Sequence, residues 1–172
     1  LAKLIIIMID ILNNTRFKFR RSTLVKADLQ KVWDFFTKTD TIFLLTPDKM
    51  QLAAFNKKEE QIIYQGQIID YWVTPILGIP VRWQTEIIDI CPKEEFTDVQ
   101  NIGPFGYWKH RHIFTETSVG VLIEDEVDYE MPIPLLTKIM DSFIVRQNLN
   151  ELFDFRQQQL HKIFNSTLQT TS

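Results

Sequence analysis

The chain has 172 residues, of which 45% are hydrophobic and 24% are charged. This length and composition predict one globular domain over residues 1–172 that needs no disulfide or structural metal to fold. The formal net charge of -3 excludes a general attraction to nucleic acid or to anionic lipid, so we expect neither as a partner.

The first twelve residues, LAKLIIIMIDIL, form an apolar run that is too short to span a bilayer and is interrupted by Asp10. The run lacks the small-residue cleavage site of a signal peptide. We interpret Met8 as the natural start, and residues 1–12 as an extension or an extra strand. The one cysteine, Cys91, excludes an intramolecular disulfide and has no neighbour that would activate it. We therefore expect a cytoplasmic protein without stable membrane insertion and with an inert thiol.

Alternation of phenylalanine with basic residues predicts a first strand over residues 16–25, with the basic side chains on its solvent-exposed face. Asp28 is placed to cap a short amphipathic helix that contains Val32 and Trp33. A second short helix is predicted after Asp40. It must end before Pro47, because the residue before a proline disfavours helical geometry.

The middle of the chain predicts consecutive strands separated by charged, glycine-bearing or proline-bearing turns. The predicted strands cover residues 49–56, 61–71, 80–90, 94–102, 107–116 and 119–130. Residues 72–80, WVTPILGIP, are predicted to form an apolar loop. Because parallel strands need long crossovers, these short connections predict an antiparallel meander.

From Leu135 the hydrophobic period changes to that of a helix about thirty residues long, or ~45–50 Å at ~1.5 Å per residue. The apolar stripe drifts near Gln147, which predicts a kink or a break there. Such a helix must cover one face of the curved sheet, so the predicted fold class is α+β.

Six short motifs follow one another from Trp83 onward, and they make the sequence resemble the START-like or Bet v 1-like (SRPBCC) superfamily. They are Trp83, FTDVQ (Phe96 to Gln100), GPF (Gly103 to Phe105), WKHRHIF (Trp108 to Phe114), DEVDY (Asp125 to Tyr129) and FDFR (Phe153 to Arg156). More narrowly, the chain is similar to the bacterial polyketide cyclase/dehydrase-like ligand-binding subgroup over about residues 16–165.

This resemblance implies a helix-grip fold, in which a curved antiparallel sheet of six or seven strands wraps around a long C-terminal helix. Relatives of this fold carry lipids, quinones, hormones and pigments, and some cyclise polyketides. The resemblance implies no cofactor and no metal. It identifies a fold more closely than a chemistry, because one fold hosts many functions.

Strand alternation predicts which side chains face the space between sheet and helix. On the last strand Asp125 and Tyr129 face inward, because the residues between them are almost all acidic. His110 and His112 share the inner face of their strand with Trp108 and Phe114. On the preceding strand, Asp98 and Gln100 share a face with Phe96 and Ile102. The candidate ligand-binding residues are Trp83, Asp98, Gln100, Trp108, His110, His112, Asp125, Tyr129, Phe153 and Arg156.

Arg156 lies on the apolar stripe of the C-terminal helix. A buried guanidinium without a partner is unfavourable, so we expect it to pair with Asp98 or Asp125 or to extend to solvent. The inward-facing polar residues as a group can be interpreted in three ways. They could satisfy one another as a structural link, fix the polar end of a bound apolar molecule, or catalyse a reaction.

The leading hypothesis is binding of a hydrophobic small molecule, such as a lipid, isoprenoid, quinone or polyketide-like compound. An alternative is a cyclase or dehydratase, with His110 or His112 as general acid/base tuned by Asp98 or Asp125. A second alternative is a regulatory or interaction domain with a vestigial cavity. The histidine pair could also chelate zinc, with Asp98 or Asp125 as third ligand, but the nearby charge of Arg156 opposes a cation, and no metal is expected. The oligomeric state is left open.

Overall fold

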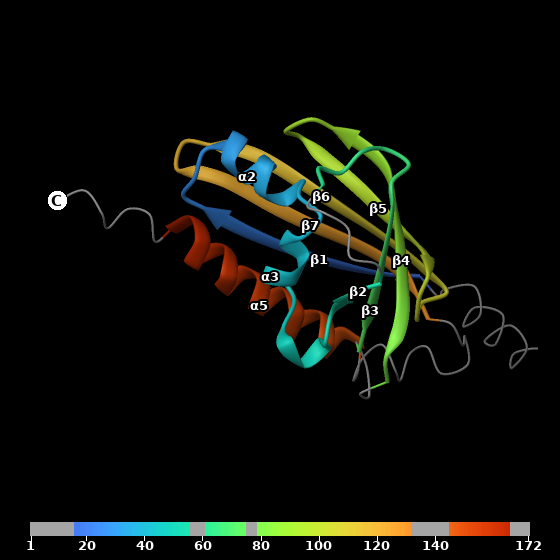
Figure 1. The fold of residues 1–172 in the computed structure, drawn as a ribbon. Helices are drawn as coiled ribbons and strands as arrows, with labels where there is room; N and C mark the ends of the chain where they lie inside the picture. Colours follow the sequence, from blue (N-terminus) through green and yellow to red (C-terminus); the bar gives the residue numbers. More distant parts are fainter. Residues whose placement is uncertain (1–15, 56–60, 75–78, 132–144, 166–172) are drawn as a thin grey trace, which may run out of the picture.

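The computed structural model describes residues 16–55, 61–74, 79–131 and 145–165. Its strands form one antiparallel sheet in the order β1-β7-β6-β5-β4-β3-β2, and the sheet curves around the helix α5 (Figure 1). The strands are β1 (Arg16–Val25), β2 (Ala53–Ala54), β3 (Ile68–Val73), β4 (Val81–Cys91), β5 (Glu95–Ile102), β6 (Tyr107–Thr117) and β7 (Gly120–Glu130). The helices are α2 (Leu29–Phe36), α3 (Thr41–Leu44), the 3-10 helix η1 (Asp48–Met50) and α5 (Arg146–Asn165). The predicted helix-grip fold is confirmed.

Local chemistry explains where α2 begins. The carboxylate of Asp28 accepts hydrogen bonds from the backbone N–H groups of Gln30 (2.8 Å) and Lys31 (3.4 Å), which have no partner inside the helix. The apolar face of α2 then buries Val32 and Trp33 against the sheet. The cap and the amphipathic pattern together give α2 both its start and its orientation.

The region between α3 and β4 differs from the sequence-based expectation. Instead of a strand over 49–56, the chain forms η1 and the two-residue strand β2. Between them, Gln51 adopts a left-handed backbone conformation (φ 46°), which interrupts an extended segment. The strand predicted over 61–71 begins only at Ile68, because a turn with φ 82° at Gly66 precedes it. The strand then extends to Val73, into the predicted loop.

The C-terminal helix buries Leu149, Phe153 and Leu160 along one stripe, as its period predicts. Its predicted first part, residues 135–144, lies outside the described residues, and so do residues 1–12. The described helix begins at Arg146, directly before the expected kink at Gln147, so the kink stays a prediction.

The pairing of β4 with β5 has two irregularities, one between Gln84 and Thr85 and one between Ile87 and Asp89. The first of them changes which side chains share a face. Gln84 pairs with Ile102 and Thr85 with Gln100, so Asn101 is an extra residue between the two pairs. Such a bulge inverts the alternation beyond it. Ile102 was expected inward, and this prediction is wrong: the residue lies opposite the outward-facing Gln84 and is 41% exposed.

The outer face of β1, β7 and β6 carries a ladder of ion pairs. Lys18 lies 3.7 Å from Asp128, and Arg20 lies 3.0 Å from Glu126, which also accepts from Arg111. The basic side chains of β1 thus face solvent and pair with the acidic side chains of β7, as alternation predicts.

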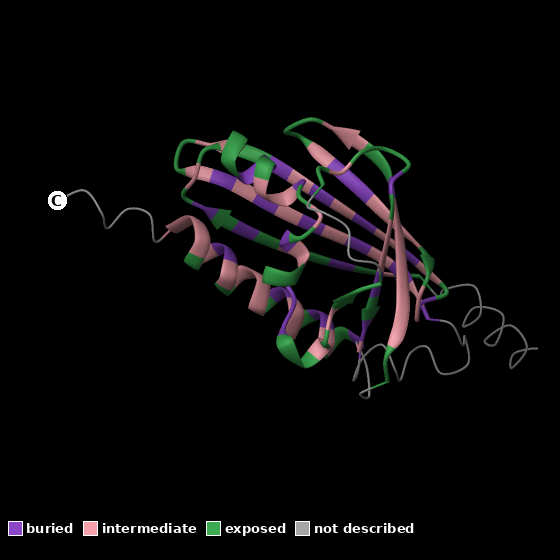
Figure 2. Ribbon diagram, viewed as in Figure 1, coloured by how far each residue is buried: buried purple, intermediate pink, exposed green. Residues whose placement is uncertain are grey.

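The inner face of the sheet is apolar at its two ends and polar in the middle. Buried residues alternate along β6 and β7 (Figure 2). At one end Trp108 and Tyr129 join Phe153 in an apolar cluster, and at the other Phe114 and Ile123 join a second cluster. His110, His112 and Asp125 lie between the two clusters in sequence and in register. The polar side chains therefore form a band across an otherwise apolar core.

Candidate functional site

A cavity of about 190 Å³ lies between the sheet and α5. Its wall is contributed by β3 to β6, by α5 and by the segment from α2 to β2, which includes α3 and η1. Most of the lining side chains are apolar or aromatic, among them Tyr71, Trp83 and Trp108. The charged lining residues near the polar band are Asp98 on β5 and Arg156 on α5, and both histidines of β6 reach the same space.

Four side chains, Asp98, His110, His112 and Asp125, form one connected group that we call the His–Asp cluster. The cluster follows from the strand register, because Asp98 pairs directly with His110 and His112 pairs directly with Asp125 across the neighbouring strands. Alternation places both histidines on the inner face of β6, with their ring centroids 3.8 Å apart.

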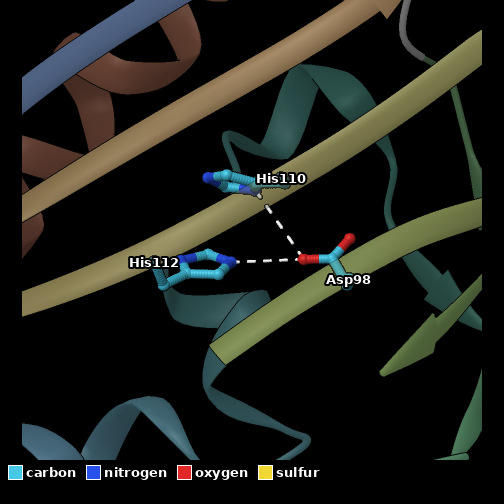
Figure 3. Close-up of side chains that lie close together, drawn as sticks. All are labelled: Asp98, His110 and His112. Atoms are coloured by element: carbon cyan, nitrogen blue, oxygen red, sulfur yellow. Dashed lines mark hydrogen bonds and ion pairs between the residues drawn. The ribbon is translucent and has the colours of Figure 1, made fainter. Parts of the chain in front are cut away.

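Each carboxylate in the His–Asp cluster contacts both imidazoles. Asp125 Oδ1 lies 2.8 Å from His110 Nε2 and 3.2 Å from His112 Nδ1. On the cavity side, Asp98 Oδ2 lies 3.3 Å from His112 Nε2 and 3.9 Å from His110 Nδ1 (Figure 3). The shortest of these contacts, between His110 and Asp125, is a well-formed hydrogen bond.

Burial and charge act differently on the members of the cluster. Burial, reinforced by the adjacent His112, lowers the pKa of His110 even though Asp125 and Asp98 oppose the shift. Burial also disfavours a charge on His112, but the two carboxylates outweigh it and raise the pKa of this residue. Burial alone would raise the pKa of Asp125, yet its contacts with the two imidazoles hold that pKa well below its usual range. When the cluster carries a proton beyond the neutral imidazoles, His112 holds it.

Aromatic rings fix the orientation of both imidazoles. Phe96 stacks on His112 with ring centroids 4.2 Å apart, and Phe153 approaches His110 edge-on at 5.8 Å. Both histidines are buried, with exposed fractions below 10%. The cluster is thus held in one arrangement and in surroundings of low polarity.

Arg156 was predicted to pair with Asp98 or Asp125 or to extend to solvent, and the pairing is not observed. Among the described residues no carboxylate lies within ion-pair distance of the guanidinium, whose Nε donates to the backbone oxygen of Leu45 at 3.3 Å. The guanidinium also lies 5.0 Å from the ring centroid of Phe153. The two carboxylates are already engaged by the histidines. Burial lowers the pKa of Arg156, while the charges of Asp125 and Asp98 partly offset this effect.

The remaining predicted residues divide between the wall of the cavity and the core behind it. Trp83 and Trp108 line the cavity and meet edge-on, with ring centroids 5.2 Å apart. Tyr129 and Phe153 are almost fully buried in the apolar cluster behind the wall. Gln100 instead bonds the backbone of Phe105, donating to its oxygen at 2.8 Å, and so holds the turn before β6.

Sequence reasoning missed Tyr71 and the segment around α3. Tyr71 lines the cavity from β3, and its hydroxyl donates to the backbone oxygen of Thr39 at 3.3 Å. Burial, followed by the nearby charge of Asp98, raises the pKa of this phenol well above its usual value. Ile42 and Leu45 close the opposite side of the cavity. The alternation of Ile69, Tyr71 and Val73 was a usable signal for the inner face of β3.

Structural comparison finds solved proteins that share this fold. The di-domain ARO/CYC StfQ from the steffimycin biosynthetic pathway matches with a TM-score of 0.69 and 13% identity, over 92% of this chain and 54% of StfQ. Major latex-like protein 151 from Panax ginseng matches with a TM-score of 0.61 and 13% identity, over 88% and 99% of the two chains. A Mycobacterium smegmatis protein matches with a TM-score of 0.59 and 12% identity, over 91% and 94%.

These similarities show that the chain shares the helix-grip fold of these proteins, as the resemblance to the Bet v 1-like (SRPBCC) superfamily implies. No protein-family model and no curated protein sequence matches the chain. Within the described residues, no helix is both long enough and apolar enough to cross a membrane. One fold hosts many functions, so the function has to be argued from the side chains of the cavity.

Proposed function

We propose that the protein binds a small hydrophobic molecule in the cavity between the sheet and α5, and that Arg156 and the His–Asp cluster fix the polar end of this guest. The aromatic wall supplies apolar contact, and a few polar groups at one place supply orientation, which is the usual composition of a binding pocket. The residues proposed to contact the guest are Tyr71, Trp83, Asp98, Trp108, His110, His112 and Arg156.

The observation that carries this proposal is the state of Arg156. Its side chain lines the cavity, but its only hydrogen bond within the described part of the chain is the one from Nε to Leu45. Arg156 is partly buried on the cavity wall, and the remaining N–H donors of its guanidinium form no hydrogen bond to the described residues, so they are available to a guest. An oxygen atom of a bound guest, best a carboxylate or phenolate, would satisfy these donors.

The size of the cavity limits the guest. At about 190 Å³ it lies below the ~300–1,000 Å³ that is usual for ligand pockets. A compact ring system of one or two rings fits this space better than a long acyl chain. Among the lipid, isoprenoid, quinone and polyketide-like candidates, the small aromatic or quinone-like compounds are therefore favoured.

The geometry supports binding better than the two alternative functions. General acid/base catalysis needs an imidazole nitrogen that is free to exchange a proton with the substrate. Three of the four imidazole nitrogens lie within 3.3 Å of a carboxylate oxygen, which leaves only His110 Nδ1, at 3.9 Å, for that role. A regulatory domain with a vestigial cavity is disfavoured, because the interior retains space lined by charged groups.

Binding can be tested with 2-naphthoate, a small bicyclic carboxylate, by its effect on tryptophan fluorescence. We expect saturable quenching with one site per chain. Arg156→Leu keeps the apolar stem volume and removes the donors, so it is expected to weaken binding about 10–100-fold, as the loss of a hydrogen bond to a charged group implies. Arg20→Gln is the matched control, because Arg20 lies on the outer face of the sheet.

Native mass spectrometry of the purified protein supplies a second measurement that does not depend on the chosen probe. A co-purified small molecule that dissociates on denaturation supports the proposal. The proposal fails if no mass co-purifies and 2-naphthoate, 2-naphthol and naphthoquinone all leave the tryptophan fluorescence unchanged. It also fails if Arg156→Leu and Arg20→Gln bind with the same affinity.

A further inference from the structure

We propose that Asp98, His110 and His112 form a binding site for a divalent metal ion of borderline softness, such as Zn²⁺, and that Asp125 supports this site from behind. The inference goes beyond guest binding and does not depend on it. It rests on the direction of the donor atoms, on the contacts of Asp125 and on the charge of the cluster.

The first argument is the convergence of three donor atoms. One donor atom from each of Asp98, His110 and His112 lies within 4.8 Å of the other two. The two imidazoles point from β6 toward the carboxylate on β5 (Figure 3). Asp98 Oδ2 is 3.3 Å from His112 Nε2 and 3.9 Å from His110 Nδ1. Ligand atoms around a tetrahedral zinc ion are about 3.3 Å apart, since each lies ~2.0–2.2 Å from the metal. Small side-chain shifts therefore suffice to bind the ion.

The second argument is the position of Asp125. Its Oδ1 contacts the ring nitrogens that face away from Asp98, at 2.8 Å from His110 Nε2 and 3.2 Å from His112 Nδ1. The hydrogen bond between His110 Nε2 and Asp125 places the proton of His110 on that side, so the lone pair of His110 Nδ1 is directed toward Asp98. His112 is hydrogen-bonded to Asp98 through Nε2, whereas its Nδ1, at 3.2 Å from Asp125 Oδ1, has no hydrogen-bond partner in the described residues. A metal ion would therefore replace the proton between His112 Nε2 and Asp98. Metal-binding histidines in proteins are commonly oriented by such a second carboxylate.

The third argument is charge. Asp125 is buried and the side chain of Asp98 is 14% exposed, and two carboxylates this close together in surroundings of low polarity are unfavourable unless positive charge compensates them. Arg156 lines the same cavity, but it forms no ion pair with either carboxylate and bonds the backbone oxygen of Leu45 instead. A divalent ion would compensate both carboxylates, and this gain opposes the repulsion from Arg156.

The surroundings favour a defined site. Phe96 stacks on His112, and Phe153 packs against His110, so neither imidazole needs to be ordered by the metal. Asp98, His110 and His112 also line the cavity, so the remaining coordination position of the ion would face this space. A preformed set of ligands with one open position is the arrangement of zinc sites that retain an exchangeable ligand.

The test uses the full chain without a histidine tag, after removal of metals by a chelator and dialysis. Titration with ZnCl₂ in a calorimeter is expected to give one ion per chain with a micromolar or tighter dissociation constant. Asp98→Asn and His112→Gln are expected to weaken this binding at least tenfold, and Asp125→Asn about 10–100-fold. His161→Gln is the matched control, because His161 lies on α5 outside the cluster and contacts the backbone oxygen of Leu24. Its affinity is expected to equal that of the wild type.

A second measurement needs no variant and so remains valid if a substitution prevents folding. The chain has 3 histidines. Added CoCl₂ is expected to shift the proton NMR signals of two imidazoles strongly and to produce visible d–d absorption, while His161 stays near its original position. The inference is overturned if calorimetry detects no ion, if the cluster variants bind as tightly as the wild type, or if Co²⁺ perturbs His161 alone.

Discussion

At the scale of single residues, the polar band is an arrangement in which every member depends on the others. Asp98 and Asp125 each lie within 3.9 Å of both imidazoles, and one hydrogen bond joins each histidine to a carboxylate. Arg156 remains apart because the carboxylates are already engaged. Alternation along β6 and β7 predicted that His110, His112 and Asp125 face inward. The partner of Arg156 is the backbone oxygen of Leu45, at the end of α3. No sequence pattern indicates how close α3 lies to α5, so this contact could not be predicted.

Removing the carboxylate of Asp125 should destabilise the fold strongly. Asp125→Asn leaves two imidazoles without their shared acceptor in a buried site, and such a loss typically costs about 3–5 kcal/mol. Asp128→Asn is the matched control on the same strand, because Asp128 faces solvent and pairs with Lys18 at 3.7 Å, where a loss of about 0–1 kcal/mol is expected. Urea denaturation measures both free energies of unfolding. Equal values for the two variants would contradict the structural role of Asp125.

The reactivity of Cys91 offers a test with a defined dependence on pH. The hydrogen bond between its thiol and Glu94 (3.3 Å), followed by burial and the neighbouring acidic charges, raises the pKa of Cys91. A raised pKa means less thiolate at a given pH, so alkylation by iodoacetamide at pH 8 is expected to be slower than for free cysteine. The rate should approach its plateau at a higher pH.

Glu94→Gln provides the control for this prediction. It removes the carboxylate charge, so alkylation of Cys91 at pH 8 should become faster and its pH profile should move to lower pH. Since the chain contains 1 cysteine, the rate of mass increase reports this thiol alone. An unchanged profile in Glu94→Gln would show that the carboxylate does not control the thiol.

At the scale of elements, predictions were accurate where a long periodic pattern met a simple physical rule. The strand over 16–25 matches β1 residue for residue, and Asp28 caps α2 as its chemistry indicates. The predictions were wrong where strand pairing or backbone conformation, and not the hydrophobic pattern, determines the local structure. The bulge at Asn101 turned Ile102 outward, and the left-handed conformation of Gln51 replaced most of a strand by η1 and β2. Neither feature is visible in hydrophobic periodicity, because both depend on the neighbouring chain segments.

The turn between β6 and β7 requires a glycine at position 120, where β7 begins. Gly120 has φ 142°, and a Cβ at this position would lie 2.0 Å from the backbone oxygen of Val25. Gly120→Ala is therefore expected to lower the free energy of unfolding by about 1–3 kcal/mol, through backbone strain and displacement of β1. Gly66→Ala is the control, because Gly66 also has a positive φ but open space around it. Thermal unfolding should show a distinctly larger loss for Gly120→Ala.

At the scale of the whole molecule, the core consists of two apolar clusters separated by the polar band that faces the cavity. Apolar residues on the same strands pack at both ends without any need for charge. A fold that required only stability would continue the apolar pattern through the middle of β6 and β7. A binding role and a purely structural role both account for this band, and they differ in what its removal would do to stability and to ligand affinity.

Replacing the entire His–Asp cluster by leucine distinguishes these roles. Substituting leucine for Asp98, His110, His112 and Asp125 together removes all the buried charges at once, and such exchanges are often neutral or stabilising by about 1–4 kcal/mol. If the cluster serves binding, the fourfold variant should unfold at the same or a higher urea concentration than the wild type and should lose affinity for both 2-naphthoate and Zn²⁺. Single substitutions should destabilise far more than the fourfold variant, because each leaves unpaired partners behind. A fourfold variant that is as unstable as Asp125→Asn would instead identify the cluster as a structural link between the strands.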